Sequence, residues 1–469
     1  MPGANHATYD AVILGAGMSG LAAGIRLAHF GHRVCILERH YSIGGLNSFY
    51  RLDGRKFDVG LHALTNFRPS DCRRGPLALL CRQLRIARED LALAPQIGSA
   101  IVFPGARLEF TNDFEHFRAE VHRVFPSQKD NFERLVNELA EYTELGSPRT
   151  LRSARQVVAE RIDDPLLVEM LFCPILFYGG PRPHDLDFGQ FSILFRSIFL
   201  EGLARPLDGV RPLLKMLARK FKSAGGELRV RAAAREIVCA GRRAVAVVLE
   251  NGEALPARFV LSSAGLRETM ALCGAANLPP AGEISFFESI SILDTRPERL
   301  GLDRTAVFFN HSDRFAYGKP DDLVDPRSGV VCVPNQFAYD EPMATGCVRL
   351  TALANYDRWA RLSPDAYRAA KVECYQRLVE SAARFVPDFR PSVVATDLFT
   401  PTTIRRFTGH ANGAVYGSPE KRYDGRTHLE NLFVCGADQG LVGIVGALLS
   451  GISMANRHVL QDKGAVAEA

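Results

Sequence analysis

The chain has 469 residues, of which 47% are hydrophobic and 23% charged, and its formal net charge is +5. This is the composition of an ordinary globular protein, and the length is sufficient for two or three domains. The charge excess is mild and no basic stripe with interleaved aromatic residues is present, which excludes nucleic acid as an expected partner. An anionic membrane surface stays compatible with these values.

The first fifty residues alternate strand, turn, helix and strand. Residues 9–14 are typical of a buried strand, and residues 34–37 form a second strand that ends at Glu38. Between them lies a G-x-G-x-x-G turn that opens a helix of small residues, and this context is typical of a dinucleotide-binding unit. The glycines of the turn are Gly15, Gly17 and Gly20. The alternative is an ordinary glycine-rich turn beside a surface glutamate.

Each part of this unit has a physical role in holding a dinucleotide. Gly15 allows the tight turn, Gly17 lets the backbone approach a pyrophosphate, and Gly20 lets the helix pack close to the sheet. The helix N-terminus, which includes Ser19, offers free N–H groups to phosphates. Glu38 is placed to accept hydrogen bonds from ribose hydroxyls. The pattern therefore predicts a dinucleotide site at this end of the chain.

The segment after Glu38 distinguishes FAD from NAD. A Gly-Gly pair extends the site past the ribose with flexible backbone, whereas a nicotinamide-binding domain normally goes straight into its next helix. A short strand with the sequence F-D-V-G follows at residues 57–60, and His62 comes just after it. These features favour FAD as the cofactor. We assign to its site Arg39, Gly44, Gly45 and Leu46.

The next part of the chain is helical in pattern, with helical apolar spacing at residues 114–124 and 131–145. Residues 166–178 and 188–200 are unusually apolar, and the second run carries four phenylalanines. Each run is either helix core or the wall of a long apolar substrate tunnel. Residues 73–86 place arginines beside leucines, which suits an interfacial helix or a surface helix whose arginine stems cover apolar area.

Further along, the pattern changes from helix to strands. A helix and four strands are expected at residues 210–224, 227–230, 236–239, 244–250 and 258–265. Asn251 and Gly252 form a turn dipeptide between two of these strands. A second mixed region has strands and a helix at residues 329–333, 347–354 and 364–385.

The C-terminal part of the chain contains a second candidate cofactor segment. Residues 431–438 are typical of a buried strand that ends at Gly436 and Asp438, and a glycine-rich helix follows to about residue 460. Eighteen uncharged residues, 439–456, approach the length of a membrane span. Six of them are Gly or Ser, so a helix packed under a cofactor is the favoured interpretation.

These motifs resemble the phytoene desaturase, carotenoid isomerase and retinol saturase group of FAD enzymes, within the flavin amine-oxidase superfamily. The resemblance rests on the acid followed by Gly-Gly, on F-D-V-G-L-H at residues 57–62 and on G-I-V-G-A-L at residues 443–448. It covers both ends of the chain well and the middle loosely.

The resemblance implies an α/β fold, with a Rossmann-type FAD-binding domain assembled from discontinuous segments and an α+β substrate domain. The FAD-binding domain would comprise residues 1–66, 205–283 and 400–469, and the substrate domain residues 67–204 and 284–399. Val238 would lie against the adenine, and Asp438 would bind the ribityl chain. The remaining cofactor residues implied at the C-terminal end are Gly436, Gly443 and Ile444.

The chemistry that the resemblance implies is hydride transfer between the flavin and a carbon of an isoprenoid or polyene chain. His62 is the first candidate for a catalytic base or polarising group and His410 the second, although a lone histidine is more often structural. The alternatives are a redox-neutral isomerase, an amine or porphyrinogen oxidase of the same fold, and a flavoprotein without catalytic activity.

The sequence also indicates the compartment and the partners. The ten cysteines form no C-x-x-C pair and no metal-ligand spacing, so we expect reduced thiols and no metal site. The first eight residues have no signal-peptide pattern. We therefore expect a cytoplasmic protein, peripheral at a membrane, that binds a hydrophobic small-molecule substrate.

Overall fold

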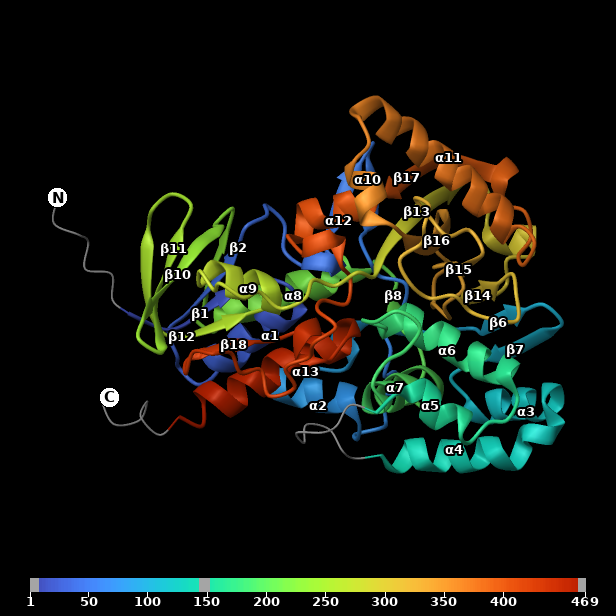
Figure 1. Ribbon diagram of the computed structural model, residues 1–469, viewed down its shortest axis with the longest axis horizontal. Coiled ribbons are helices and arrows are strands. Elements are labelled where there is room, and N and C mark those ends of the chain that lie inside the picture. The colour runs from blue at the N-terminus through green and yellow to red at the C-terminus, as the bar shows by residue number, and fades with distance from the viewer. Residues whose placement is uncertain (1–7, 143–151, 463–469) are drawn as a thin grey trace.

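The computed structural model of the chain describes residues 8–142 and 152–462. Two seven-stranded sheets lie along the long axis of the molecule, and helices cover them (Figure 1). The first sheet contains the G-x-G-x-x-G unit, and the second belongs to the part of the chain that carries the apolar runs.

The first sheet brings together distant parts of the chain. Its strand order is β10-β11-β12-β1-β2-β9, and β18 pairs with β12. β1 is parallel to both β12 and β2, and the nearly continuous apolar sequence of β1 is explained by burial along the strand. The strands are β1 (Tyr9–Leu14), β2 (Val34–Glu38), β9 (Glu227–Val230), β10 (Ala234–Ala240), β11 (Arg243–Leu249), β12 (Ala254–Ser262) and β18 (Leu432–Val434).

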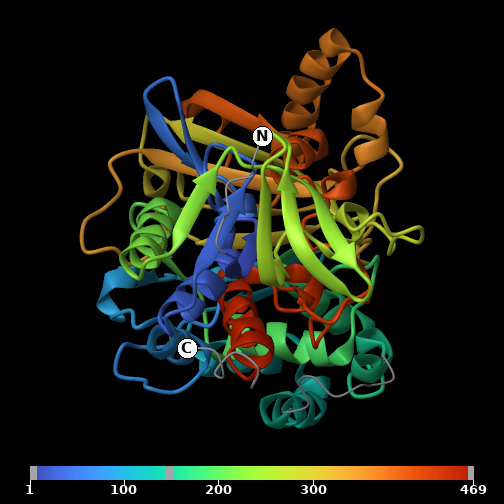
Figure 2. The same ribbon diagram turned by 90° about the vertical axis from the view of Figure 1, so that its left-hand side faces the viewer.

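Three helices pack against this sheet: α1 (Met18–Ala28), α8 (Val210–Ser223) and α13 (Gly443–Met454). Figure 2 looks onto this end of the molecule and shows α13 beside α1 below the strands. Glycine permits this close packing, because a Cβ on Gly451 of α13 would lie 2.0 Å from the carbonyl oxygen of Ser19 in α1. The first and last parts of the cofactor signature are therefore held together by a helix–helix contact.

The second sheet has the order β17-β13-β16-β15-β14-β6-β7. Its strands are β6 (Ser99–Phe103), β7 (Ala106–Phe110), β13 (Ser285–Leu293), β14 (Ala306–Asn310), β15 (Ser328–Cys332), β16 (Gly346–Ala354) and β17 (Val393–Phe399). One face packs against α11 (Pro364–Ala382) in a cluster that includes the indole of Trp359. The other face packs against the helices in the first half of the chain.

Those helices are α3 (Phe114–Val124), α4 (Lys129–Glu141), α5 (Ala154–Ala159), α6 (Pro165–Gly179) and α7 (Phe188–Phe195). The first apolar run lies in α6, and the second forms α7 and a segment with wider turns, Arg196–Leu200. Most side chains of both runs are buried in one aromatic-rich core. Phe177 and Tyr178 are the residues of these runs that also line the main cavity. The core interpretation thus accounts for most of both runs, and the tunnel-wall interpretation for these two side chains.

The other elements are β3 (Phe49–Leu52), β4 (Arg55–Asp58), β5 (Leu93–Pro95), β8 (Ala204–Pro206), α2 (Pro76–Leu84), α9 (Leu266–Leu272), α10 (Tyr356–Ala360) and α12 (Pro401–Thr408). The C-terminal helix, expected to reach about residue 460, is α-helical to Met454 and continues with wider turns over Ala455–Val459. The helix expected at 131–145 ends at Glu141, and residues 143–145 lie outside the described residues.

The α/β fold expected from the sequence is confirmed. Strands of the first sheet come from residues 1–66, 205–283 and 400–469, and the second sheet is built from the parts between, although the domain boundaries themselves stay a prediction. Within the described part of the chain, none of the helices has the length and apolar character needed to span a bilayer.

Candidate functional site

A cavity of about 1000 Å³ is lined by residues of both sheets. One end is formed by residues at the carboxyl ends of β1, β2 and β12 and just after β18, where ligands bind in open α/β sheets. The other end is formed by residues of β13, β15, β16 and β17. The cavity therefore extends from the first sheet to the second, and a cofactor site at one end can adjoin a substrate site at the other.

Two helix N-termini open into this cavity. α1 begins after Gly17 and α13 begins after Val442, and neither N-cap residue supplies a side-chain hydrogen bond. Their first N–H groups and positive dipole ends are suited to phosphates or other electron-rich groups. A Cβ on Gly17 would meet no described atom within 4 Å, so this glycine leaves space for a ligand. The assigned residues that line the cavity here are Gly15, Gly17, Ser19, Gly436, Gly443 and Ile444.

Glu38 is buried at the end of β2 and lines the cavity. Its two carboxylate oxygens accept hydrogen bonds from the backbone N–H groups of Ala16 and His40, both at 2.9 Å. These bonds fix the side chain in one position. Each carboxylate oxygen has a second acceptor site, which suits a pair of ribose hydroxyls.

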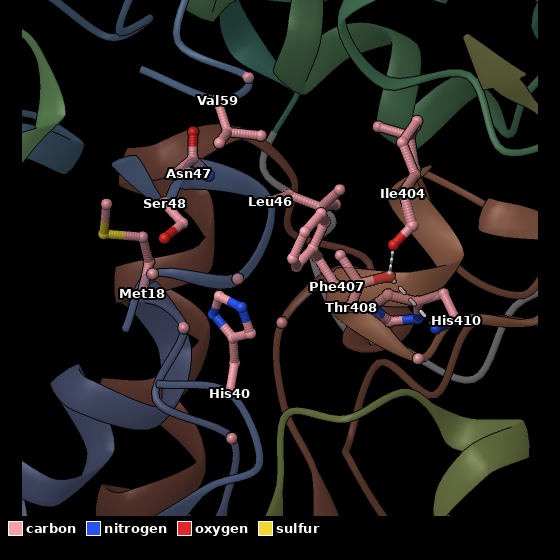
Figure 3. Close-up of a pocket in the computed structure, with 18 of the residues that line it drawn as sticks. Met18, His40, Leu46, Asn47, Ser48, Val59, Ile404, Phe407, Thr408 and His410 are labelled. Carbon is pink, nitrogen blue, oxygen red and sulfur yellow. Dashed lines mark hydrogen bonds between the residues drawn. The ribbon is translucent and has the colours of Figure 1, made fainter. Parts of the chain in front are cut away.

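The loop after Glu38 faces α12 across the cavity. Figure 3 shows Leu46, Asn47, Ser48 and His40 on one side and Ile404, Phe407, Thr408 and His410 on the other. The rings of His40 and Phe407 meet edge-to-face with centroids 5.0 Å apart. Arg39 lines the cavity but donates to the carbonyl of Arg406 at 2.6 Å, so it stabilises the C-terminal end of α12.

The Gly-Gly pair lies directly beside the first turn of the dinucleotide motif. Gly44 has a φ of +112°, and its N–H donates to the carbonyl of Ala16 at 2.9 Å. A Cβ on Gly45 would lie 3.8 Å from the Cα of Gly17, so the two backbones form one wall. Gly44, Gly45 and Leu46 all line the cavity, as expected of cofactor residues.

Two assigned residues are not among those that line the cavity, namely Gly20 and Val238. A Cβ on Gly20 would lie 2.0 Å from the carbonyl oxygen of Gly15, so Gly20 serves the helix–sheet packing also predicted for it. Val238 lies further along β10, and residues 232–234 take its place on the cavity wall. The reason is that the N–H of Ala232 donates to the carbonyl of Glu38 at 2.9 Å, which holds this segment at the end of β2.

Asp438 lines the cavity, but its carboxylate mainly joins two other segments through three residues. It accepts from the N–H groups of Ser418, at 2.7 Å, and Leu266, and it faces the ammonium group of Lys421 at 3.7 Å. The Lys421 side chain is 3% exposed, and burial lowers its pKa to about 8 although Asp438 opposes this shift. Asp438 is thus as much a structural anchor of the site as a group available to a cofactor.

His62 lies in a polar cluster at the substrate end. Its Nε2 is 3.1 Å from the Thr351 hydroxyl and 3.5 Å from the Glu288 carboxylate. Arg349 is 2% exposed, donates from Nε to Glu288 at 2.7 Å, and also donates to the carbonyl groups of Val59 and Leu61. Burial alone would raise the pKa of Glu288, but Arg349 and His62 outweigh it and lower the pKa to about 2.

An apolar chamber adjoins this cluster; we define it by Phe177, Tyr178, Phe286, Val330, Val415 and Tyr416, which all line the cavity. In the sheet Glu288 is opposite Thr351, and Thr351 is opposite Val330, so the polar cluster and the chamber form one row across β13, β16 and β15. Burial raises the pKa of Tyr416 above the ordinary range for tyrosine, which indicates a dry environment.

His410 also lines the cavity, but its surroundings differ. It follows α12, its N–H donates to the Thr408 hydroxyl at 3.2 Å, and a Cβ on Gly265 would lie 3.2 Å from its Nδ1 (Figure 3). The glutamate nearby, Glu268, accepts from the N–H of Ala411 rather than from the imidazole. The structure thus places a hydroxyl and a carboxylate beside the His62 ring, whereas the hydrogen bond described for His410 is made by its backbone.

Comparison with known families gives a match over residues 18–458 to the flavin-containing amine oxidoreductases. This chain belongs to that family. Prolycopene isomerase 2 of an Oncidium hybrid cultivar is 22% identical, covering 96% of this chain and 83% of the relative. The all-trans-retinol 13,14-reductase of Danio rerio is 24% identical, covering 95% and 85%. A solved oxidoreductase from Methanosarcina mazei is 16% identical with a TM-score of 0.67, covering 95% of this chain and all of that one.

This flavin-dependent enzyme therefore has the cofactor that its sequence indicated, and the resemblance to the desaturase, isomerase and saturase group is confirmed. The site fits FAD on its own observations: two helix N-termini without side-chain caps, open space at Gly17, and a fixed carboxylate at Glu38. Which individual residues contact FAD stays a prediction.

Sequence reasoning missed the partners of His62. Glu288 and Arg349 are the charged residues of two otherwise uncharged strands, F-F-E-S-I-S-I-L and V-R-L-T-A-L-A. A charged residue in a buried strand normally has a partner, so these two positions were a usable signal. Their pairing with each other, and with a histidine more than two hundred residues away, depends on strand register that the sequence does not display.

Proposed function

We propose that this enzyme acts on carbon–carbon bonds of a hydrophobic isoprenoid or polyene, resembling a carotenoid or retinoid, by desaturation, saturation or isomerisation. The observation that carries the proposal is the apolar chamber directly beside the His62 cluster in the cavity that fits FAD. The names of two relatives, a prolycopene isomerase and an all-trans-retinol 13,14-reductase, support the substrate class.

When bound, FAD would supply hydride transfer to or from a carbon of the chain. Desaturation also releases a proton, saturation consumes one, and isomerisation leaves the proton count unchanged. We propose His62 as the group that holds this proton. Thr351 and Glu288 hold its Nε2, and Nδ1 forms no hydrogen bond with the described residues, which leaves Nδ1 for proton transfer. The Glu288 carboxylate, 3.5 Å from Nε2, would help to orient the ring.

The chamber contributes by binding and by excluding water. Burying apolar chain against phenylalanine and valine side chains releases about 25 cal/mol per Å². The rings are held by mutual contacts, with centroid distances of 5.9 Å from Phe177 to Phe286 and 6.0 Å from Phe286 to Tyr416. A fixed, dry wall would orient a long chain without polar anchors.

An amine or porphyrinogen oxidase is the second candidate, because the family includes amine oxidoreductases. An ammonium substrate would need an unpaired carboxylate near the reacting centre. Glu288 is already paired with Arg349, and Asp397 accepts a hydrogen bond from Tyr50. This arrangement supports the polyene over the amine.

The test is an anaerobic incubation of oxidised and of reduced enzyme with carotenoid and retinoid substrates, followed by product mass and visible absorption. Loss of hydrogen indicates desaturation, gain indicates saturation, and an unchanged mass with a shifted spectrum indicates isomerisation. His62→Gln should keep the flavin spectrum and lower turnover by roughly 100-fold or more. Flavin reduction by a small soluble amine, with no response to any polyene, would overturn the proposal.

We also propose that the protein is cytoplasmic and contacts a membrane peripherally. All ten cysteines are unpaired, which supports a reducing compartment. A substrate that dissolves poorly in water would have to be collected from a bilayer.

A further inference from the structure

Two further cavities are lined by residues of α2, and the larger also by residues of α13, which Figure 1 shows next to α2. The smaller has a volume of about 280 Å³ and the larger about 550 Å³. They share Asn66 and Pro76, so they adjoin each other at the start of α2. We call the surface that contains both cavities the α2 face.

The smaller cavity is an arginine pocket. Its arginines are Arg68, Arg73, Arg74, Arg82 and Arg88. No Asp or Glu is among the described residues that line either cavity, and none of these arginines forms an ion pair with a described carboxylate. Elsewhere arginines are commonly paired, as Arg155 is with Glu169. The pocket therefore carries an excess of positive charge, and Glu89 acts on Arg88 only through a longer-range electrostatic interaction.

Backbone contacts hold this charge in place. Arg82 donates to the carbonyl of Arg73 at 2.8 Å, and Arg88 donates to the carbonyl of Arg68 at 3.1 Å. Glu201 is buried near Gly75, where it accepts a hydrogen bond from Asn66 at 2.7 Å and makes no ion pair with Arg68 within the described residues. Most guanidinium N–H groups of the pocket stay available. Their fork geometry matches the oxygens of a phosphate group.

The larger cavity beside it is mainly apolar. Leu79 of α2 is 41% exposed and lines it, together with Leu194 of α7 and Leu449 and Ile452 of α13. Arg457 lies on its rim, also without an ion pair to a described carboxylate. Exposed leucine beside an excess of positive charge is the composition of a surface that inserts shallowly between anionic headgroups.

The larger cavity is also next to the functional site. Leu441 and Val442, just before α13, line both it and the main cavity. A short segment of backbone and two apolar side chains therefore lie between the α2 face and the apolar chamber. A substrate that enters the larger cavity from a bilayer would therefore reach the main cavity by passing Leu441 and Val442.

We propose that the α2 face docks on an anionic phospholipid bilayer, with lipid phosphates in the arginine pocket and the larger cavity open to apolar molecules from the bilayer. The positive charge and the exposed leucine favour an anionic bilayer as the partner of this face. The adjoining main cavity would receive apolar substrate from that bilayer. The part that concerns substrate delivery rests on the proposed function, whereas the docking itself does not.

Vesicle flotation of the FAD-loaded full chain tests the docking. Wild type should bind vesicles of phosphatidylcholine with phosphatidylglycerol, bind pure phosphatidylcholine vesicles much less, and release as salt rises. The triple variant Arg73→Glu, Arg74→Glu and Arg82→Glu should lower the partition coefficient by on the order of 100-fold, since each arginine near an anionic surface strengthens binding several-fold. The matched control is Arg235→Glu, Arg361→Glu and Arg384→Glu, three exposed arginines on other faces with the same charge change.

Equal binding by the triple variant and the control would overturn the proposal, as would failure of wild type to bind anionic vesicles. Protection of the pocket arginines from chemical modification by inorganic phosphate, without vesicle binding, would assign the pocket to a soluble anion instead. Both triple variants should keep their flavin spectrum and turn over detergent-dissolved substrate like wild type. If neither the wild type nor the variants turn over any polyene, the proposed function is wrong, but the vesicle-binding result still tests the docking.

Discussion

Replacing Glu288 with glutamine perturbs the charged cluster that holds His62. The substitution keeps the side-chain volume and one acceptor oxygen but removes the negative charge opposite Arg349, whose side chain is 2% exposed. Breaking a buried ion pair from one side costs about 3–5 kcal/mol. Backbone carbonyl groups still accept from Arg349, so we expect a loss near 3 kcal/mol in the free energy of unfolding at neutral pH.

The pH dependence of this loss identifies its origin. The pKa of Glu288 is about 2 in the folded protein, below the ordinary value of 4.5. Its charge therefore stabilises the fold above pH 4.5, and this contribution is lost as the pH falls toward 2. Between pH 7 and about pH 3.5, the stability difference between wild type and Glu288→Gln should shrink by roughly 1.4 kcal/mol.

The assay is urea unfolding of both proteins, followed by circular dichroism at several pH values. Glu236→Gln, at an exposed position, controls for the loss of one carboxylate. A stability difference that stays constant from neutral to acidic pH would refute the reasoning, because it would show that the Glu288 carboxylate titrates alike in the folded and unfolded states.

The other predictions concern the cofactor end. Gly17→Val should abolish FAD retention while the apoprotein stays folded. Gly20→Ala should instead lower the stability of the fold, because its Cβ would meet the Gly15 carbonyl. FAD titration and thermal melts distinguish these two effects. Glu38→Gln should weaken FAD binding by about 1–3 kcal/mol, and an unchanged affinity by fluorescence titration would contradict the assigned role. Burial lowers the pKa of Lys421 to about 8, so Lys421 makes the fold more stable as the pH rises from 8 toward 10.5. In urea unfolding, Lys421→Met should remove this rise in the free energy of unfolding. A variant that keeps the rise would contradict the assignment to Lys421.

The sequence by itself determined the cofactor end of the protein. A dinucleotide unit depends on local backbone geometry, so strand, glycine turn, helix and acid can be read from adjacent residues. The loop at Gly44 and Gly45 could be placed for the same reason, whereas the role of Gly436 after the last strand came from the resemblance; Gly44, Gly45 and Gly436 all line the cavity. The local pattern also predicted the strand that contains Val238, whereas the contact of Val238 with the adenine came only from the resemblance and stays a prediction; Val238 is not among the residues that line the cavity.

Only the tertiary structure decided what surrounds the substrate. Sheet register puts Glu288 opposite Thr351 and brings His62 to both, and no local pattern encodes a register between strands so distant in the chain. The same holds for the apolar runs, because core and cavity wall have the same composition and differ only in what packs against them. Sites built from residues adjacent in the chain can thus be predicted from the sequence, whereas sites built from residues on separate strands depend on how the strands pair in the folded protein.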